Sequence, residues 1–141
     1  MKIINGEGAI FGRLATIAAK SALEGEQVVV VNAEKIIISG DPEQIIAKFK
    51  VRRGLKQKAD PEKSPKFPRR PDMLVRRMIR GMLPFDKSTG RMAYKRIIVY
   101  MGVPDELVKQ LGSAVPVEKK VPKMYISMND LSRELGWYGK A

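Results

Sequence analysis

Apolar and basic residues recur with helical spacing between residues 71 and 83. At about 100° per residue, the apolar positions fall on one contiguous half of a helix and the arginines fall opposite. The apolar half holds Leu74, Val75, Met78, Ile79, Met82 and Leu83, and the basic half holds Arg76, Arg77 and Arg80. Pro71 suits a first helical turn, and Pro84 ends the helix near Leu83. The pattern predicts a helix with a buried apolar face and an exposed basic face.

The N-terminal part has the pattern of a β-α-β unit. Residues 1–5 indicate a strand, three glycines a turn, and residues 10–24 a helix that ends at Gly25. The inward positions of this helix are Leu14, Ile17, Ala18 and Ala22. Residues 27–32 include four successive valines, a run typical of a strand buried on both faces of a parallel sheet.

A strand, a capped helix and a long loop follow. Residues 35–39 indicate another strand, and Asp41 followed by Pro42 is a helix start with an N-cap and a proline at the first position. This helix should reach about Arg53. Residues 54–70 contain three prolines among charged residues and have no clear period, which predicts an extended basic loop.

The remaining segments complete an α/β pattern. Ser88 or Thr89 can cap a short helix that runs to about residue 96, and residues 97–101 have the composition of a last core strand. A helix is expected over 105–111 and an irregular stretch over 113–123. Ser127 and Asp130 have the spacing of a capping box for a final helix that ends near Gly136.

Alternating strands and helices predict a three-layer α/β/α domain. The sheet should be mainly parallel with about four strands, and the basic loop and a helical C-terminal tail should extend from it. We expect residues 1–112, including the loop at 54–70, to form the core domain. Residues 113–141 should form a C-terminal extension with a short helix.

Composition excludes several kinds of chemistry. The chain has 141 residues, 44% of them hydrophobic, which suits one domain with a real core. It has neither cysteine nor histidine, so disulfides, thiolate nucleophiles, Cys/His zinc sites and imidazole catalysis are all ruled out. No apolar run approaches the roughly 20 residues that span a bilayer, and residues 1–8 do not resemble a signal peptide. We therefore expect a cytoplasmic protein without a membrane partner.

The basic charge is concentrated in one interval. The formal net charge is +12, and residues 48–96 hold 17 lysines and arginines against four acidic residues. Like charges in one region repel one another and destabilise the compact state, so a polyanionic partner would offset a cost that the fold alone does not explain. A basic adaptor for acidic proteins or anionic membranes stays open as an alternative, as does an ordinary solvated surface.

A nucleotide-binding enzyme is the main rival hypothesis. Gly6, Gly8 and Gly12 lie between a predicted strand and helix, and Glu34 follows the second strand, as in a dinucleotide-binding unit. However, Phe11 occupies the position of the third glycine of that fingerprint, so a structural turn is the better explanation. Carboxylate pairs at 60/62 and 105–106 fit a loop and a helix start better than a catalytic or magnesium site. We expect no catalytic residue, cofactor, metal or small-molecule substrate.

The candidate nucleic-acid contacts are therefore the cations of the basic interval. They are Arg52, Arg53, Lys56, Lys58, Lys66, Arg69, Arg70, Arg76, Arg77, Arg80, Lys87, Arg91, Lys95 and Arg96. Prolines on either side of Arg69 and Arg70 stiffen the segment and reduce the entropy lost when it lies along a phosphate backbone. Phe67 could stack on a base or cover the surface of the domain. If the helix arginines are exposed, their removal should leave the stability of the fold unchanged.

Short motifs along the chain resemble a known family. Ile-Arg-Gly-Met-Leu-Pro at 79–84, Gly-Arg at 90–91 and Ile-Ile-Val-Tyr-Met-Gly at 97–102 are similar to the large-subunit ribosomal protein thirteen family. Gly-Arg-Leu-Ala at 12–15 and Val-Asn-Ala-Glu at 31–34 extend the resemblance over most of residues 1–112. The segments at 67–71 and 131–137 look like the archaeal and eukaryotic branch. Asn5-Gly6, where many members carry Asp-Ala, departs from the pattern.

The resemblance implies a structural role without catalysis. It implies an α/β fold that binds large-subunit ribosomal RNA as a monomer within the cytoplasmic ribosome and lies beside other large-subunit proteins. Arginine forks and lysine charges would neutralise phosphates of several RNA segments, which are read by shape and backbone more than by base sequence.

Overall fold

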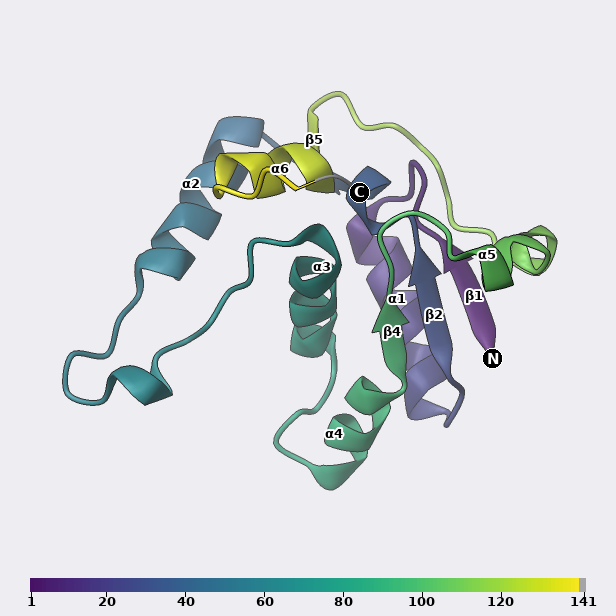
Figure 1. Cartoon of the computed structure of the whole chain (residues 1–141), viewed down its shortest axis with the longest axis horizontal. Helices are drawn as coiled ribbons and strands as arrows, with labels where there is room; N and C mark the ends of the chain where they lie inside the picture. The colour runs from purple at the N-terminus through teal and green to yellow at the C-terminus, as the bar shows by residue number, and fades with distance from the viewer. Residues whose placement is uncertain (140–141) are drawn as a thin grey trace.

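The computed structural model describes residues 1–139 of the chain (Figure 1). The strands are β1 (Lys2–Asn5), β2 (Val28–Val31), β3 (Ile37–Ser39), β4 (Ile97–Val99) and β5 (Tyr125–Ser127). The α-helices are α1 (Phe11–Leu23), α2 (Pro42–Gly54), α3 (Pro71–Ile79), α4 (Ser88–Lys95), α5 (Asp105–Val108) and α6 (Met128–Glu134). Short 3₁₀ turns lie at Ala33–Lys35, Pro61–Lys63, Arg80–Met82 and Leu111–Ser113.

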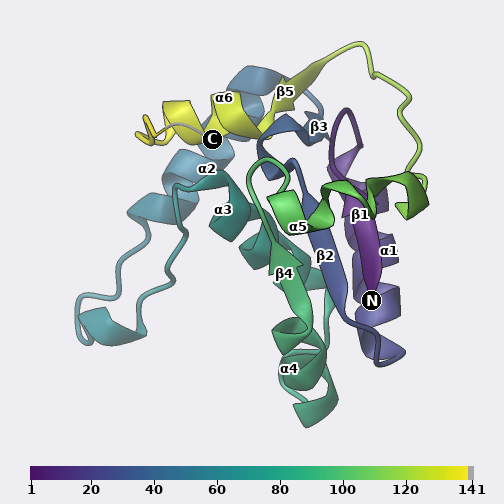
Figure 2. The ribbon, with the colours of Figure 1, turned by 45° about the vertical axis from the view of Figure 1, so that its right-hand side comes forward.

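A parallel sheet with strand order β1-β2-β4 forms the centre of the fold. One face carries Ile4, Val28 and Val30, which pack with α1 and α3 in the main core. The other face carries Ile3, Val29 and Val31, which pack against Leu107 of α5 and its neighbours. Figure 2 shows α5 in front of the sheet, and α1 lies behind it. The predicted α/β fold with a mainly parallel sheet is confirmed, and burial on both faces explains the valine run.

The segment at 35–39, expected to add a strand to the parallel sheet, does not do so. It does contain the strand β3, but β3 pairs antiparallel with β5, so that Ile38 lies opposite Ile126. The parallel sheet therefore has three strands rather than about four, and a second sheet of two strands lies beside it. The short strand β5 is absent from the prediction because its three residues give too little pattern to recognise.

The predicted boundaries of α1, α2 and α6 are confirmed, whereas α5 ends at Val108 rather than at residue 111. Asp41 caps α2 by accepting a hydrogen bond from the Glu43 amide at 3.1 Å. Ser127 caps α6 by accepting one from the Asp130 amide, also at 3.1 Å. Gly25 follows α1 with a φ of +100°, a left-handed conformation that favours glycine. The expected cap at Ser88 or Thr89 is wrong, because α4 begins at Ser88 and the residue before it makes no side-chain cap.

The C-terminal residues return to the main core. After the Leu111–Ser113 turn, Val115 bridges to Ile4 of β1, and the chain then passes over the top of the molecule in Figure 1. Met128 and Leu131 of α6 are fully buried and belong to the same hydrophobic cluster as Ile4 and Leu14. Residues 113–123 are irregular apart from this bridge and the end of the 3₁₀ turn, as expected.

The central helix is shorter than predicted. It ends at Ile79 and continues as a 3₁₀ turn over Arg80–Met82, which rotates the last residues relative to an ideal α-helix. Leu74, Val75 and Ile79 have no exposed surface and Leu83 is buried, as expected. Met82 is 43% exposed, so its assignment to the core face is wrong.

This difference gives a stability prediction. Ile79→Val removes one methylene from a fully buried side chain and should lower the free energy of unfolding by about 0.5–1.5 kcal/mol. Met82→Leu, at an exposed position, should change it by less than about 0.5 kcal/mol. Urea denaturation of both variants measures this difference. An equal loss in both would place Met82 in the core after all.

Candidate nucleic-acid interface

The loop between α2 and α3 leaves the body of the protein and returns to it (Figure 1). The Gln57 amide donates to the Ser64 hydroxyl oxygen at 2.9 Å, which joins the outgoing and returning arms. Five candidate cations of this loop are exposed, and four of them form no ion pair with a described residue. Those four are Lys56, Lys58, Lys66 and Arg69. The loop therefore presents uncompensated positive charge on both arms.

We expect the loop to be mobile in the absence of RNA. It buries little apolar surface, and the backbone hydrogen bonds within it involve only the amides of Lys63 and Ser64. Most amides of residues 55–66 should exchange with solvent within the dead time of a hydrogen-exchange experiment. On RNA they should become protected. Strong protection throughout the free loop would contradict this prediction.

Phe67 anchors the returning arm of the loop to two helices. Its ring lies 5.9 Å from the guanidinium carbon of Arg52 and 4.8 Å from that of Arg77. Its carbonyl oxygen accepts a hydrogen bond from Arg53. Of the two roles predicted for Phe67, the structure favours packing against the protein over base stacking, because two guanidinium groups already contact its ring.

The arginines of the central helix also contact aromatic rings. The guanidinium carbon of Arg76 lies 4.8 Å from the ring centre of Tyr94, and that of Arg80 lies 3.7 Å from that of Phe85. These two rings meet edge to face at 5.6 Å. All three helix arginines are half-buried, so the expectation of a fully exposed basic face is wrong. Cation–π contacts hold these side chains against the surface.

Burial and mutual repulsion act on two of the candidate arginines. Partial burial lowers the pKa of Arg53, and the nearby charge of Arg69 lowers it further. Burial likewise lowers the pKa of Arg77, and the charge of Arg80 adds to the effect. Guanidinium groups stay charged at neutral pH despite such shifts. The cluster therefore holds like charges close together at an energetic cost.

Arg70 is the candidate most fully neutralised within the protein. Its Nε donates to Oδ1 of Asp72 at 2.8 Å, and its Nη2 donates to the other carboxylate oxygen. This bidentate hydrogen bonding to Asp72 raises the pKa of Arg70. Asp72 is buried and also accepts from the Met73 amide at the start of α3. The pair fixes the helix start and leaves Arg70 less charge to offer an anion.

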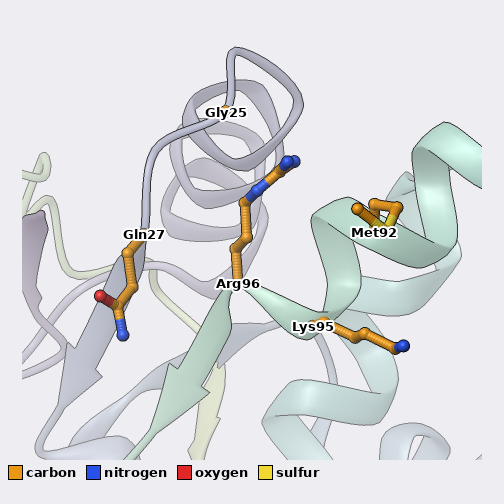
Figure 3. A pocket seen from close by; sticks show the side chains of 5 residues that line it. All are labelled: Gly25, Gln27, Met92, Lys95 and Arg96. Carbon is orange, nitrogen blue, oxygen red and sulfur yellow. The ribbon is translucent and has the colours of Figure 1, made fainter.

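The candidates around α4 divide into two kinds. Lys87 and Lys95 are exposed, whereas Arg91 donates to the carbonyl oxygens of Phe85 and Asp86 at 3.1 and 2.9 Å. Arg96 donates to the Ala22 carbonyl oxygen at 3.2 Å, near the end of α1. Figure 3 shows that the side chains of Lys95 and Arg96 diverge. The sequence did not indicate these bonds to backbone carbonyls, because periodicity carries no information on which carbonyl a side chain will reach.

The glycine turn does not have the features of a nucleotide site. A Cβ atom at Gly6 would lie 2.7 Å from Cγ1 of Ile36 and 2.9 Å from the Val31 carbonyl oxygen, so the turn packs against protein. Gly12 belongs to α1 rather than to the turn. Glu34, the residue suggested for a ribose contact, accepts a hydrogen bond from the Gly102 amide at 3.0 Å. These residues support the interpretation as a structural turn.

Within residues 1–139, no group of three or more carboxylates is arranged to hold a metal ion. Over the same residues, no helix is both long and apolar enough to cross a membrane.

The fold and this surface define a basic α/β protein in which several arginines are held by packing on aromatic rings or by bonds to backbone carbonyls, whereas the lysines are exposed. Comparison with known proteins shows which family this chain belongs to. The family model described as Ribosomal protein L13 matches residues 1–106. The chain belongs to this family, which is one of structural proteins and not of enzymes.

Individual relatives match nearly the whole chain. Large ribosomal subunit protein uL13 of Methanocaldococcus jannaschii is 44% identical over 137 residues, which cover 96% of this chain and 98% of the relative. The protein of the same name from Methanosphaera stadtmanae is 45% identical over 98% of this chain and 94% of its own length. That of Thermoplasma acidophilum is 40% identical over 98% and 100%. These archaeal relatives confirm the predicted family and its archaeal type.

Proposed function

We propose that this protein is a structural constituent of the large ribosomal subunit that binds large-subunit ribosomal RNA and supports subunit assembly. Its partners would be that RNA and neighbouring large-subunit proteins, and it would lie as a monomer within the cytoplasmic ribosome. The names of the relatives support the place in the large subunit. The observation that carries RNA binding is the set of loop and helix cations left without carboxylate partners among the described residues.

The candidate cations have different roles in RNA binding. The exposed lysines and Arg69 act as charges that follow the phosphate backbone, and Arg77 and Arg80 present planar forks in fixed orientations. Arg53, Arg70, Arg91 and Arg96 make hydrogen bonds within the protein and chiefly hold the surface in shape. A folded RNA bound in this way is recognised by the positions of its phosphates.

Binding should weaken steeply as salt rises. A surface that neutralises roughly ten phosphates releases their counterions, which gives a log–log slope of about −7 to −9 for the association constant against salt concentration. Filter binding of a large-subunit RNA fragment over a salt series measures this slope. A slope near zero would remove the electrostatic mechanism.

Two rival functions have separate tests. A nucleotide-binding enzyme would require saturable cofactor binding at the turn that contains Gly6, and we expect none in an equilibrium titration. A basic adaptor for acidic proteins or membranes would not co-sediment with ribosomal subunits. We expect co-sedimentation with large subunits, and crosslinks from residues 48–96 to their RNA.

A further inference from the structure

A hollow lies between the returning arm of the loop and the basic side of the central helix. It has a volume of about 460 Å³ and is lined by loop residues 62–66 together with Arg77 and Arg80. The lining cations are Lys63, Lys66, Arg77 and Arg80, and the one lining carboxylate is that of Glu62. Lys63 is paired with Asp60 at 3.0 Å, outside the lining. The hollow is therefore strongly cationic and has walls from two separate segments.

The two arginines of the hollow are held in place by aromatic rings rather than by acids. The guanidinium carbon of Arg77 lies 4.8 Å from the Phe67 ring centre, and that of Arg80 lies 3.7 Å from the Phe85 ring centre. Neither arginine forms an ion pair with any described residue. Stacking leaves the edge of a guanidinium, which carries its N–H donors, free for another acceptor.

Two arginines outside the hollow are neutralised by carboxylates of the protein. Arg13 is paired with Glu118, and Arg70 with the buried Asp72. At the hollow, by contrast, Arg77 and Arg80 repel each other, and burial together with this repulsion lowers the pKa of Arg77. Two like charges held together without an acid indicate a site whose compensating anion comes from outside the protein.

The chemistry of the lining favours phosphate over a nucleobase. The ring of Phe67 already contacts two guanidinium groups, and apart from Pro65 the hollow is lined by polar and charged residues. Base recognition in single-stranded RNA depends on stacking surfaces, whereas the phosphate group matches the planar fork of arginine.

We propose that this hollow is a phosphate clamp that grips the backbone of one RNA strand between the loop and the central helix. Phe67 and Phe85 are its positioning residues, because their rings fix the orientation of Arg77 and Arg80. The clamp rests on the proposed function, since it names the part of the RNA that this surface holds. It also explains why the loop returns to α3 through an aromatic residue whose ring contacts two guanidinium groups.

The test uses the full-length protein and two small probes. One is an abasic tetranucleotide, which offers a sugar–phosphate backbone without bases, and the other is inorganic tripolyphosphate. Arginine Nε–Hε signals are followed by NMR during each titration. The abasic strand should shift the Arg77 and Arg80 signals saturably at one equivalent and leave that of Arg13 unmoved. Tripolyphosphate should shift the same signals but bind more weakly, because it is too short to extend along the hollow.

Three variants separate charge from orientation. Phe67→Leu keeps an apolar side chain but removes two cation–π contacts, and Arg77→Lys keeps the charge but loses the planar fork. Each should weaken binding of the abasic strand by roughly five- to tenfold. Arg13→Lys, the matched change at an arginine outside the clamp, should have no effect. Melting curves confirm that each variant is folded.

Other outcomes would overturn either the phosphate clamp or the proposed ribosomal function. Unmoved Arg77 and Arg80 signals, or unchanged affinity of both Phe67→Leu and Arg77→Lys, overturn the clamp, even if the ribosomal RNA fragment still binds. Tighter binding of tripolyphosphate than of the abasic strand overturns the assignment to an RNA strand in favour of free polyphosphate. Failure of the parent protein to bind ribosomal RNA, with abasic-strand binding intact, overturns the proposed function and leaves the phosphate site.

Discussion

Changing Arg76, Arg77 and Arg80 together to glutamine should weaken binding to large-subunit RNA by roughly a hundredfold near physiological salt and make the salt slope shallower by about 2 to 3. It should also lower stability. The three guanidinium groups contact Tyr94, Phe67 and Phe85, and loss of three such contacts costs about 1.5–3 kcal/mol, partly offset by relief of charge repulsion. Filter binding and thermal melting on the same preparations measure the two effects.

A matched control variant removes three positive charges from outside the basic interval. Lys20, Lys109 and Lys123 are exposed and lie outside the basic interval. Their joint replacement by glutamine should leave the melting temperature unchanged and reduce RNA affinity far less. If both triple variants lose affinity equally, net charge alone drives binding, and the arrangement of the helix arginines has no particular role.

Gly90→Ala should destabilise the fold by about 3 kcal/mol or more, the largest single effect expected on stability. A Cβ atom at this position would lie 2.1 Å from the Pro84 carbonyl oxygen and 2.4 Å from its carbon. Both are backbone atoms, so they cannot move aside as a flexible side chain can. Relief of the overlap requires α4 to separate from the turn that carries Phe85, against which Arg80 stacks. Chemical denaturation measures the loss.

A second glycine serves as its control. A Cβ atom added at Gly12, in α1, would meet no other atom within 4 Å, and Gly12 does not have a positive φ. Gly12→Ala should therefore stabilise the protein by about 0.5–1 kcal/mol. RNA affinity per folded molecule should be unchanged in Gly12→Ala. A neutral effect of Gly90→Ala would mean that the contact between α4 and the Pro84 turn is loose in solution.

The basic side of the central helix combines a feature that the sequence predicts with one that it does not. Periodicity places the arginines opposite the apolar positions, and this is confirmed. It does not predict that the arginines are half-buried, because the rings that contact them belong to Phe67 before the helix and to Phe85 and Tyr94 after it. The expectation that their removal leaves stability unchanged is therefore replaced by an expected loss.

Local signals in the sequence determined much of this protein. The caps at Asp41 and Ser127, the left-handed Gly25 and the valine run of β2 each depend on residues close together in the chain, so their patterns are visible without the fold. The concentration of cations between residues 48 and 96 is likewise a property of the sequence. Together with the short motifs, it was enough to indicate the family and a polyanionic partner.

Only the tertiary structure decided which segments meet. The pairing of β3 with β5 joins residues almost 90 positions apart, and burial of Met128 and Leu131 brings the C-terminal helix into the main core. The tertiary structure also decided which cations are free to bind an anion. Some of them contact a ring, a carboxylate or a backbone carbonyl that comes from another part of the chain or from the turn beside it. Such contacts depend on the packing of the whole chain, and no local periodicity encodes them.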